Sequence, residues 1–135
     1  KTETSIQGLH VLLTEDNELN MEIAEFILES EGAVITKAWN GQEAVDIFQN
    51  SDEGTFDIIL MDVMMPVMDG LSATRTIREM DRKDAREIPI IAMTANAFDE
   101  DRKRSREAGM DRHLAKPLDP REIVKTISEC ISHKK

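Results

Sequence analysis

Cysteine, positive charge and long apolar runs are all scarce in this sequence of 135 residues. Its one cysteine, Cys130, excludes an internal disulfide, and the sequence has no cysteine–histidine cluster of the kind that holds zinc. Lysine and arginine number 17 against 27 acidic residues, which gives a net charge of −10. This excess of negative charge argues against sequence-independent binding to nucleic acid and against binding to an anionic membrane. No apolar run approaches the roughly 20 residues that a membrane-spanning helix needs.

The residues that are present suit one globular domain. Hydrophobic residues make up 40% and charged residues 33% of the chain, which is slightly polar but unlike a disordered protein. A chain of this length can bury one core of ordinary size. We expect residues 8–132 to form the domain, with residues 1–7 as an N-terminal linker and residues 133–135 as a C-terminal tail. The composition as a whole predicts a soluble domain in the cytoplasm.

Short apolar runs alternate five times with amphipathic runs along the chain. The apolar runs are continuous, which is typical of parallel strands that are buried on both faces. A helix after each strand would cover both faces of such a sheet and give an α/β fold. We expect strands at residues 9–13, 33–36, 56–61, 88–93 and 112–115.

Apolar residues at helical spacing predict a helix after four of the five strands, and the very polar segment 97–108 is also expected to be helical. Asn40 and Glu43 have the spacing of a capping box at the start of the second helix. The five helices are marked in turn by Leu19, Ile23, Phe26 and Ile27, by Ala44, Ile47 and Phe48, by Ala73, Ile77 and Met80, by the polar segment 97–108, and by Ile123, Ile127 and Ile131.

Polar residues stand directly after four of the five expected strands, where an open parallel sheet binds its ligands. They are Glu15, Asp16, Asp62, Thr94 and Lys116. Three carboxylates at one edge would repel one another, and a divalent cation such as Mg²⁺ relieves that repulsion with hard oxygen ligands. A lysine and a hydroxyl beside them could hold an anionic oxygen. The set therefore predicts phosphoryl chemistry, with a carboxylate as the nucleophile.

Each of these residues also has an ordinary structural explanation when it is taken alone. Glu15 and Asp16 could interact favourably with the positive end of a helix. Asp62 and Thr94 could cap helices, and Lys116 could be a solvated lysine. The joint occurrence of all five at strand ends favours a functional site over these explanations.

The segments that carry these residues resemble the signature of bacterial two-component receiver domains. They are EDN at 15–17, LMDVMMPVMDG at 60–70, AMTAN at 92–96 and KP at 116–117. The resemblance covers about residues 8–131, and the sequences of these motifs are most similar to those in receiver domains of hybrid sensor histidine kinases. It implies a flavodoxin-like, doubly wound five-stranded parallel sheet in the order 2-1-3-4-5, with five helices on both faces. The strand order follows from the resemblance alone.

The resemblance implies a role for each site residue in aspartyl phosphorylation. Asp62 would be the phosphoacceptor and a ligand of Mg²⁺. Asp16 would bind the metal directly, and Glu15 would bind it directly or through water. The backbone carbonyl of Met64 would be a further ligand. Lys116 would pair with a phosphoryl oxygen, so the domain would catalyse its own phosphorylation and dephosphorylation.

Two residues would carry the conformational response that the resemblance implies. Thr94 would hydrogen-bond a phosphoryl oxygen and move on phosphorylation. His113 takes the place of an aromatic switch residue that is commonly Tyr or Phe, which leaves a pH effect open. The surface of helix 97–108, strand 112–115 and the last helix would then change shape.

The resemblance also implies the partners of the domain. A histidine kinase or a histidine phosphotransfer domain would donate the phosphoryl group, and a downstream partner would contact the switching surface. A homodimer through the same helices stays open, whereas nucleic acid and direct membrane contact are not expected. The domain would either stand free or belong to a hybrid kinase, itself a protein-histidine kinase that could be membrane-anchored.

Three other functions compete with this interpretation. An aspartyl-phosphate phosphatase usually has an acid–base aspartate two residues after its nucleophile, where this chain has Met64. A flavodoxin-like mononucleotide-binding protein would need a phosphate-binding loop where Glu15 and Asp16 stand. A degenerate receiver would act as a phosphorylation-independent docking domain, and the complete set of acidic, threonine and lysine residues argues against it.

Overall fold

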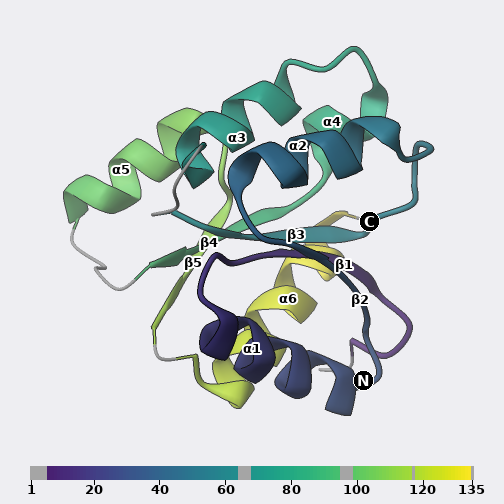
Figure 1. The fold of residues 1–135 in the computed structure, drawn as a ribbon, viewed down its shortest axis with the longest axis vertical. Helices are drawn as coiled ribbons and strands as arrows, with labels where there is room; N and C mark the ends of the chain where they lie inside the picture. The colour runs from purple at the N-terminus through teal and green to yellow at the C-terminus, as the bar shows by residue number, and fades with distance from the viewer. Residues whose placement is uncertain (1–5, 64–67, 95–98, 117, 135) are drawn as a thin grey trace.

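The computed structural model describes residues 6–63, 68–94, 99–116 and 118–134. Five parallel strands form one sheet in the order β2-β1-β3-β4-β5, which confirms the predicted topology. The central strand β3 is flanked by β1 and β4 (Figure 1). The strands are β1 His10–Thr14, β2 Val34–Ala38, β3 Ile58–Asp62, β4 Ile90–Thr94 and β5 Arg112–Ala115.

Helices cover both faces of the sheet, as predicted for this fold class (Figure 1). Helices α1 and α6 lie on one face, and α2, α3, α4 and α5 lie on the other. The described residues form six helices: α1 Glu18–Ser30, α2 Gly41–Asn50, α3 Gly70–Arg78, α4 Lys83–Glu87, α5 Asp99–Ala108 and α6 Pro120–Lys134.

The short helix α4 is absent from the sequence prediction of five helices. Its five residues, KDARE, include one apolar side chain, Ala85, which is buried. One turn with one apolar residue has no helical periodicity to detect. None of the helices in the described ranges is long and apolar enough to cross a membrane.

The apolar residues of the strands divide between two cores, one on each face of the sheet. Along β3, Ile59 and Met61 pack on the α2–α5 side, whereas Ile58 and Leu60 pack on the α1–α6 side. All four are fully buried, which explains why this strand reads as a continuous apolar run. The sheet is therefore a rigid central layer whose strand ends can hold a site.

The start of α2 confirms the predicted capping residues with one shift in register. The Asn40 side chain accepts a hydrogen bond from the backbone N–H of Glu43 at 2.8 Å. The Glu43 carboxylate accepts from the backbone N–H of Trp39 at 2.8 Å, one residue before the cap. This pair fixes the entry of the chain into α2 directly after β2.

The helix α1 is confirmed, but three of the four apolar residues whose spacing predicts it face away from the core. Leu19, Ile23 and Phe26 are 64%, 45% and 74% exposed, whereas Ile27 is buried. The side chains that face the core are Met21, Ala24, Ile27 and Leu28. Because α1 is apolar on two sides, helical spacing alone selects the stripe with the larger side chains, and the sheet packs against the other one.

Candidate functional site

Most of the predicted site residues lie at the carboxyl edge of the sheet, where Asp62 ends β3 and where Glu15 and Lys116 directly follow β1 and β5. The backbone N–H of Glu15 donates to the carbonyl of Ala38 at 3.1 Å, and that of Lys116 donates to Thr94 at 2.9 Å. These bonds continue the strand ladders past their last residues. Side-chain alternation along the strands therefore places Glu15, Asp62 and Lys116 on the α1–α6 side.

Lys116 bridges the two most deeply buried carboxylates of this edge. Its Nζ lies 2.9 Å from Oε1 of Glu15 and 2.9 Å from Oδ2 of Asp62. Glu15 is 2% exposed and Asp62 is 3% exposed, while Lys116 is half-buried. The second oxygen of Glu15, Oε2, accepts the backbone N–H of Asn17 at 3.1 Å. One ammonium group therefore pairs with two carboxylates that are largely shielded from solvent.

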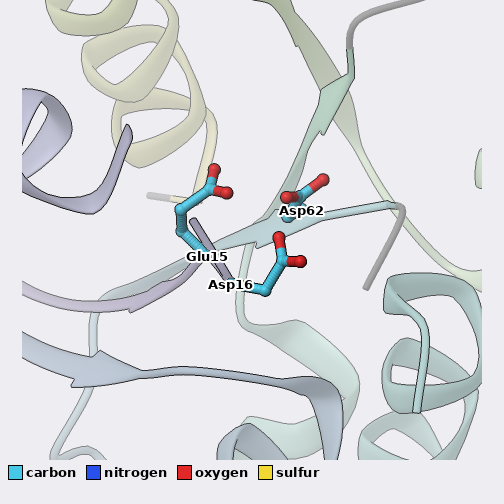
Figure 2. Close-up of side chains that lie close together, drawn as sticks. All are labelled: Glu15, Asp16 and Asp62. Carbon is cyan, nitrogen blue, oxygen red and sulfur yellow. The ribbon is translucent and has the colours of Figure 1, made fainter. Parts of the chain in front are cut away.

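Asp16 completes a group of three carboxylates with Glu15 and Asp62. Each offers an oxygen, and these oxygens lie within 4.8 Å of one another. The three side chains gather at the ends of β1 and β3 (Figure 2). Oxygen ligands of this kind suit Mg²⁺, and a divalent cation would offset the charge that Lys116 leaves unbalanced. The residues present therefore fit a bound Mg²⁺.

The charges at this edge change the acidity of Asp62 and Lys116. Burial, together with the nearby carboxylate of Glu15, raises the pKa of Asp62 to about 7 against the opposing hydrogen bond from Lys116. Burial alone would lower the pKa of Lys116, but its hydrogen bonds to Asp62 and Glu15 raise it above the usual value. The lysine therefore stays charged, while a cation would favour the ionised form of Asp62.

Thr94 and His113 lie on the other side of the sheet plane. Thr94 is the last residue of β4 and is buried, and its neighbour Met93 is in register with Asp62. His113 is half-buried in β5, in register with Ala92. Since Ala92 packs on the α2–α5 side, alternation places Thr94 on that side as well. His113 lies inside β5 and not at its carboxyl end, and the predicted ligand Met64 lies outside the described residues.

Two glycines that sequence reasoning did not assign hold the chain close behind the site. The backbone N–H of Gly70 donates to Val63 at 3.0 Å, and a Cβ at Gly70 would collide with the carbonyl of Asp62. The backbone N–H of Gly41 donates to Met68 at 3.0 Å, and a Cβ there would collide with that carbonyl. The Asn-Gly pair before α2 was the signal available for Gly41.

Comparison with known proteins identifies relatives along most of the chain. Residues 11–128 match the family model described as the response regulator receiver domain. The chain is 38% identical, over 87% of its length, to part of the hybrid signal transduction histidine kinase I of Dictyostelium discoideum. It spans 7% to 16% of the length of the plant and Dictyostelium histidine kinases that it matches.

Solved structures extend this likeness to the fold. The receiver domain of sensor histidine kinase PA1611 from Pseudomonas aeruginosa PAO1, described with a magnesium ion coordinated in its active site cleft, is 40% identical with a TM-score of 0.83. That match covers 93% of this chain and 98% of the other. The Saccharomyces cerevisiae complex of Ypd1, a histidine phosphotransfer protein, with the receiver domain of Ssk1 matches at 29% identity and TM-score 0.84, covering 95% and 92% of the two chains.

Proposed function

The chain belongs to the response regulator receiver domain family, and we propose that it accepts a phosphoryl group from a phosphohistidine onto Asp62 in a two-component phosphorelay. The observation that carries the proposal is the bridge from Lys116 to Asp62 and Glu15, beside the exposed carboxylate of Asp16. A site built only for stability would not bury two carboxylates around one lysine. The complete set favours phosphorylation over a degenerate docking domain.

Mg²⁺ is the cofactor that the donor set fits, and the magnesium in the PA1611 receiver domain supports this assignment. We assign Asp16 and Asp62 as direct ligands and Glu15 as a direct or water-mediated ligand. The backbone carbonyl of Met64 is the fourth proposed ligand. When bound, Mg²⁺ would neutralise charge on the phosphoryl oxygens.

Asp62 is the proposed nucleophile, and its neighbours stabilise the group that is transferred. A carboxylate oxygen of Asp62 attacks phosphorus in line, an O–P bond forms, and the P–N bond of the phosphohistidine breaks. The electron pair stays on the imidazole, which leaves neutral when its other ring nitrogen carries a proton. Lys116 and the hydroxyl of Thr94 each hold a phosphoryl oxygen, so positioning and fixed charge supply most of the rate.

The proposed response begins at Thr94, which shifts toward the phosphoryl group with His113 following. Strand alternation places both residues on the side of the sheet that α5 covers, which supports α5 and β5 as part of the surface that changes. The resemblance alone adds α6, which lies on the other face. That surface would bind the downstream partner, and a homodimer would use the same helices. The response would bias an equilibrium between two states through a local change of charge.

The proposed domain spans residues 8–132, with residues 1–7 as a linker and residues 133–135 as a tail. Ile6, within that linker, is already buried in the core on the α1–α6 side. We place the domain in the cytoplasm because kinases phosphorylate their histidines there with ATP. The similarity to a segment of a hybrid kinase supports a histidine kinase or a histidine phosphotransfer domain as donor.

The decisive experiment is intact mass spectrometry after incubation with Mg²⁺ and acetyl phosphate. We expect the wild type to gain one alkali-labile phosphoryl group and the Asp62→Asn variant to gain none. A stoichiometric gain by Asp62→Asn would overturn the assignment of the acceptor. No gain by the wild type, with no Mg²⁺ binding in a calorimetric titration, would instead establish a degenerate docking domain.

A further inference from the structure

Three buried hydroxyl groups within the described residues have no hydrogen-bond partner. They belong to Thr14, Thr74 and Ser128. A buried hydroxyl without a partner costs the folded state free energy, and it is uncommon enough in native proteins to call for an explanation such as a ligand or a water molecule. Thr14 differs from the other two in its place, since it ends β1 and directly precedes two residues of the carboxylate group, Glu15 and Asp16.

The neighbours of Thr14 in the sheet place its side chain on the α2–α5 side. Thr14 is in register with Ala38 of β2 and with Met61 of β3, and both of these side chains pack in the core on that side. Thr14 is completely buried there. Because that core is built from apolar side chains, the nearest polar side chains to Thr14 along the chain are the carboxylates that follow it.

Asp16 is the carboxylate of the site that lacks a donor. Glu15 accepts from Lys116 and from the backbone N–H of Asn17, and Asp62 accepts from Lys116. Within the part of the chain that the structure describes, the carboxylate of Asp16 has neither a hydrogen bond nor an ion pair. Carboxylates that bind a metal ion are themselves held by hydrogen bonds from the groups behind them. One proposed metal ligand therefore still needs a donor.

Thr14 and Asp16 lie on the same side of the chain. The backbone N–H of Glu15 continues the strand ladder past Thr14, and side chains two residues apart leave a strand on the same side. Figure 2 shows the side chains of Glu15 and Asp16 leaving the chain in different directions. The buried hydroxyl without an acceptor therefore stands two residues before the carboxylate without a donor, on its side of β1.

We propose that the hydroxyl of Thr14 is a positioning group for Mg²⁺ binding. It donates a hydrogen bond to the carboxylate of Asp16, directly or through one water molecule, when an oxygen of that carboxylate binds the metal. The proposal rests on the proposed function, in which Asp16 is a direct ligand. The hydroxyl is unsatisfied in the metal-free protein and satisfied in the metal-bound protein, and this difference favours binding.

Thr74 supplies the matched control. Its hydroxyl is also completely buried and also without a partner among the described residues, but it belongs to α3 and not to a strand end. Valine has nearly the shape of threonine, so Thr14→Val and Thr74→Val each remove an unsatisfied hydroxyl without opening a cavity. In the presence of a chelator, both variants should unfold at a urea concentration equal to or above that of the wild type.

The test is a calorimetric titration of Mg²⁺ into the wild type and the variants. We expect Thr14→Val to bind about tenfold more weakly, the lower end of the range for loss of a group that holds a metal ligand. Thr14→Ser keeps the hydroxyl and should, like Thr74→Val, bind as the wild type does. In phosphorylation by acetyl phosphate, Thr14→Val should need about tenfold more Mg²⁺ to reach half of its maximal rate, and the maximal rate should change less.

Four results would overturn the proposal and leave the phosphoacceptor function standing. An unchanged Mg²⁺ affinity of Thr14→Val would show that the core merely tolerates this hydroxyl. An equal loss in Thr14→Ser would assign the effect to packing, and an equal loss in Thr74→Val would show that it is not specific to the strand end. A lower urea midpoint of Thr14→Val with chelator would show that the hydroxyl is already satisfied without metal.

The wild type separates these results from a failure of the proposed function. A wild type that binds no Mg²⁺ and gains no phosphoryl group from acetyl phosphate would overturn the proposed function and the role of Thr14 together. A wild type that is phosphorylated, beside a Thr14→Val variant with normal Mg²⁺ affinity, would overturn the role of Thr14 alone.

Discussion

The charged side chains at the two edges of the sheet differ in how they are paired. At the carboxyl edge, Lys116 is shared by two buried carboxylates, and burial raises the pKa of Asp62 to about 7. At the amino edge, Arg78 donates to the carbonyl of Gly109 at 3.0 and 2.8 Å and to that of Ala85 at 3.1 Å. Its guanidinium also donates to Asp111 at 3.0 Å.

A second arginine gives the amino edge the same character. Arg82 donates to the carbonyls of Phe48 and Ser51, each at 2.8 Å, and pairs with Asp84 at 2.7 Å. It also lies over the ring of Phe48, 4.4 Å from the centroid. Both arginines therefore satisfy carbonyls and carboxylates, whereas at the carboxyl edge one lysine faces three carboxylates. One edge serves the stability of the fold, and the other keeps a site ready for its ligand.

The largest expected effect is on the carboxyl edge, from Lys116→Ala. Removing the ammonium group takes away the fixed charge that we propose holds a phosphoryl oxygen, so phosphorylation by acetyl phosphate should slow by about 10²- to 10³-fold. Time-resolved mass spectrometry measures this rate. Lys125→Ala, at an exposed position of α6, is the control. A rate within twofold of the wild type would show that Lys116 is only structural.

The matching change at the amino edge is Arg78→Ala. It leaves carbonyls of Gly109 and Ala85 without their donors, so the free energy of unfolding should fall by about 2–4 kcal/mol. Urea denaturation measures the loss, and the phosphorylation rate of the folded fraction should not change. The control is Arg75→Ala, an exposed arginine of the same helix. A folded variant with slow phosphorylation would mean that the two edges are coupled.

Asp62→Asn should stabilise the metal-free protein at pH 8. The pKa of Asp62 is raised to about 7, above the ordinary 3.8, so the folded state binds a proton more tightly than the unfolded state. The wild type therefore gains stability as pH falls from 8 to 5 and loses it as pH rises through 7. We expect the variant to be more stable by about 1–3 kcal/mol at pH 8, which is less than the pKa shift alone implies, because loss of the ionised partner of Lys116 offsets part of the gain.

Urea denaturation with a chelator at pH 8 and pH 5 measures this difference, which should shrink at the lower pH. Asp81→Asn, at an exposed position, should show no such change. A variant that is less stable than the wild type at both pH values would mean that Asp62 contributes to the fold as an ionised partner of Lys116. The contrast between the edges would then disappear.

The smallest expected effect is a loss of Mg²⁺ affinity in Gly41→Ala. A Cβ at this position would collide with the carbonyl of Met68, so Met68 or the start of α2 must shift. We expect roughly a tenfold weaker Mg²⁺ affinity, a size seen when groups that orient metal ligands are changed. Calorimetric titration measures it. Gly54→Ala, at φ +85° with open space around it, controls for lost stability and should bind Mg²⁺ normally.

The strands and most of the site residues could be predicted from local patterns in the sequence, whereas the order of the strands was predicted from the family resemblance alone. Strand β3 is apolar at each position before Asp62, and the polar residues after β1 and β5 mark the same edge. The roles of Arg78 and Arg82 could not be predicted, since their partners lie up to 34 residues away along the chain. The exposure of Leu19, Ile23 and Phe26 on α1 could not be predicted either, because helical spacing does not say which of two apolar stripes packs against the sheet.

The position of Trp39 gives the protein a built-in optical probe. The chain has one tryptophan and no tyrosine, so its near-ultraviolet emission comes almost entirely from one indole. That indole is partly exposed where β2 passes into α2, two residues before the glycine that meets Met68. A signal from so small a region would follow events at the carboxyl edge in real time, without a label.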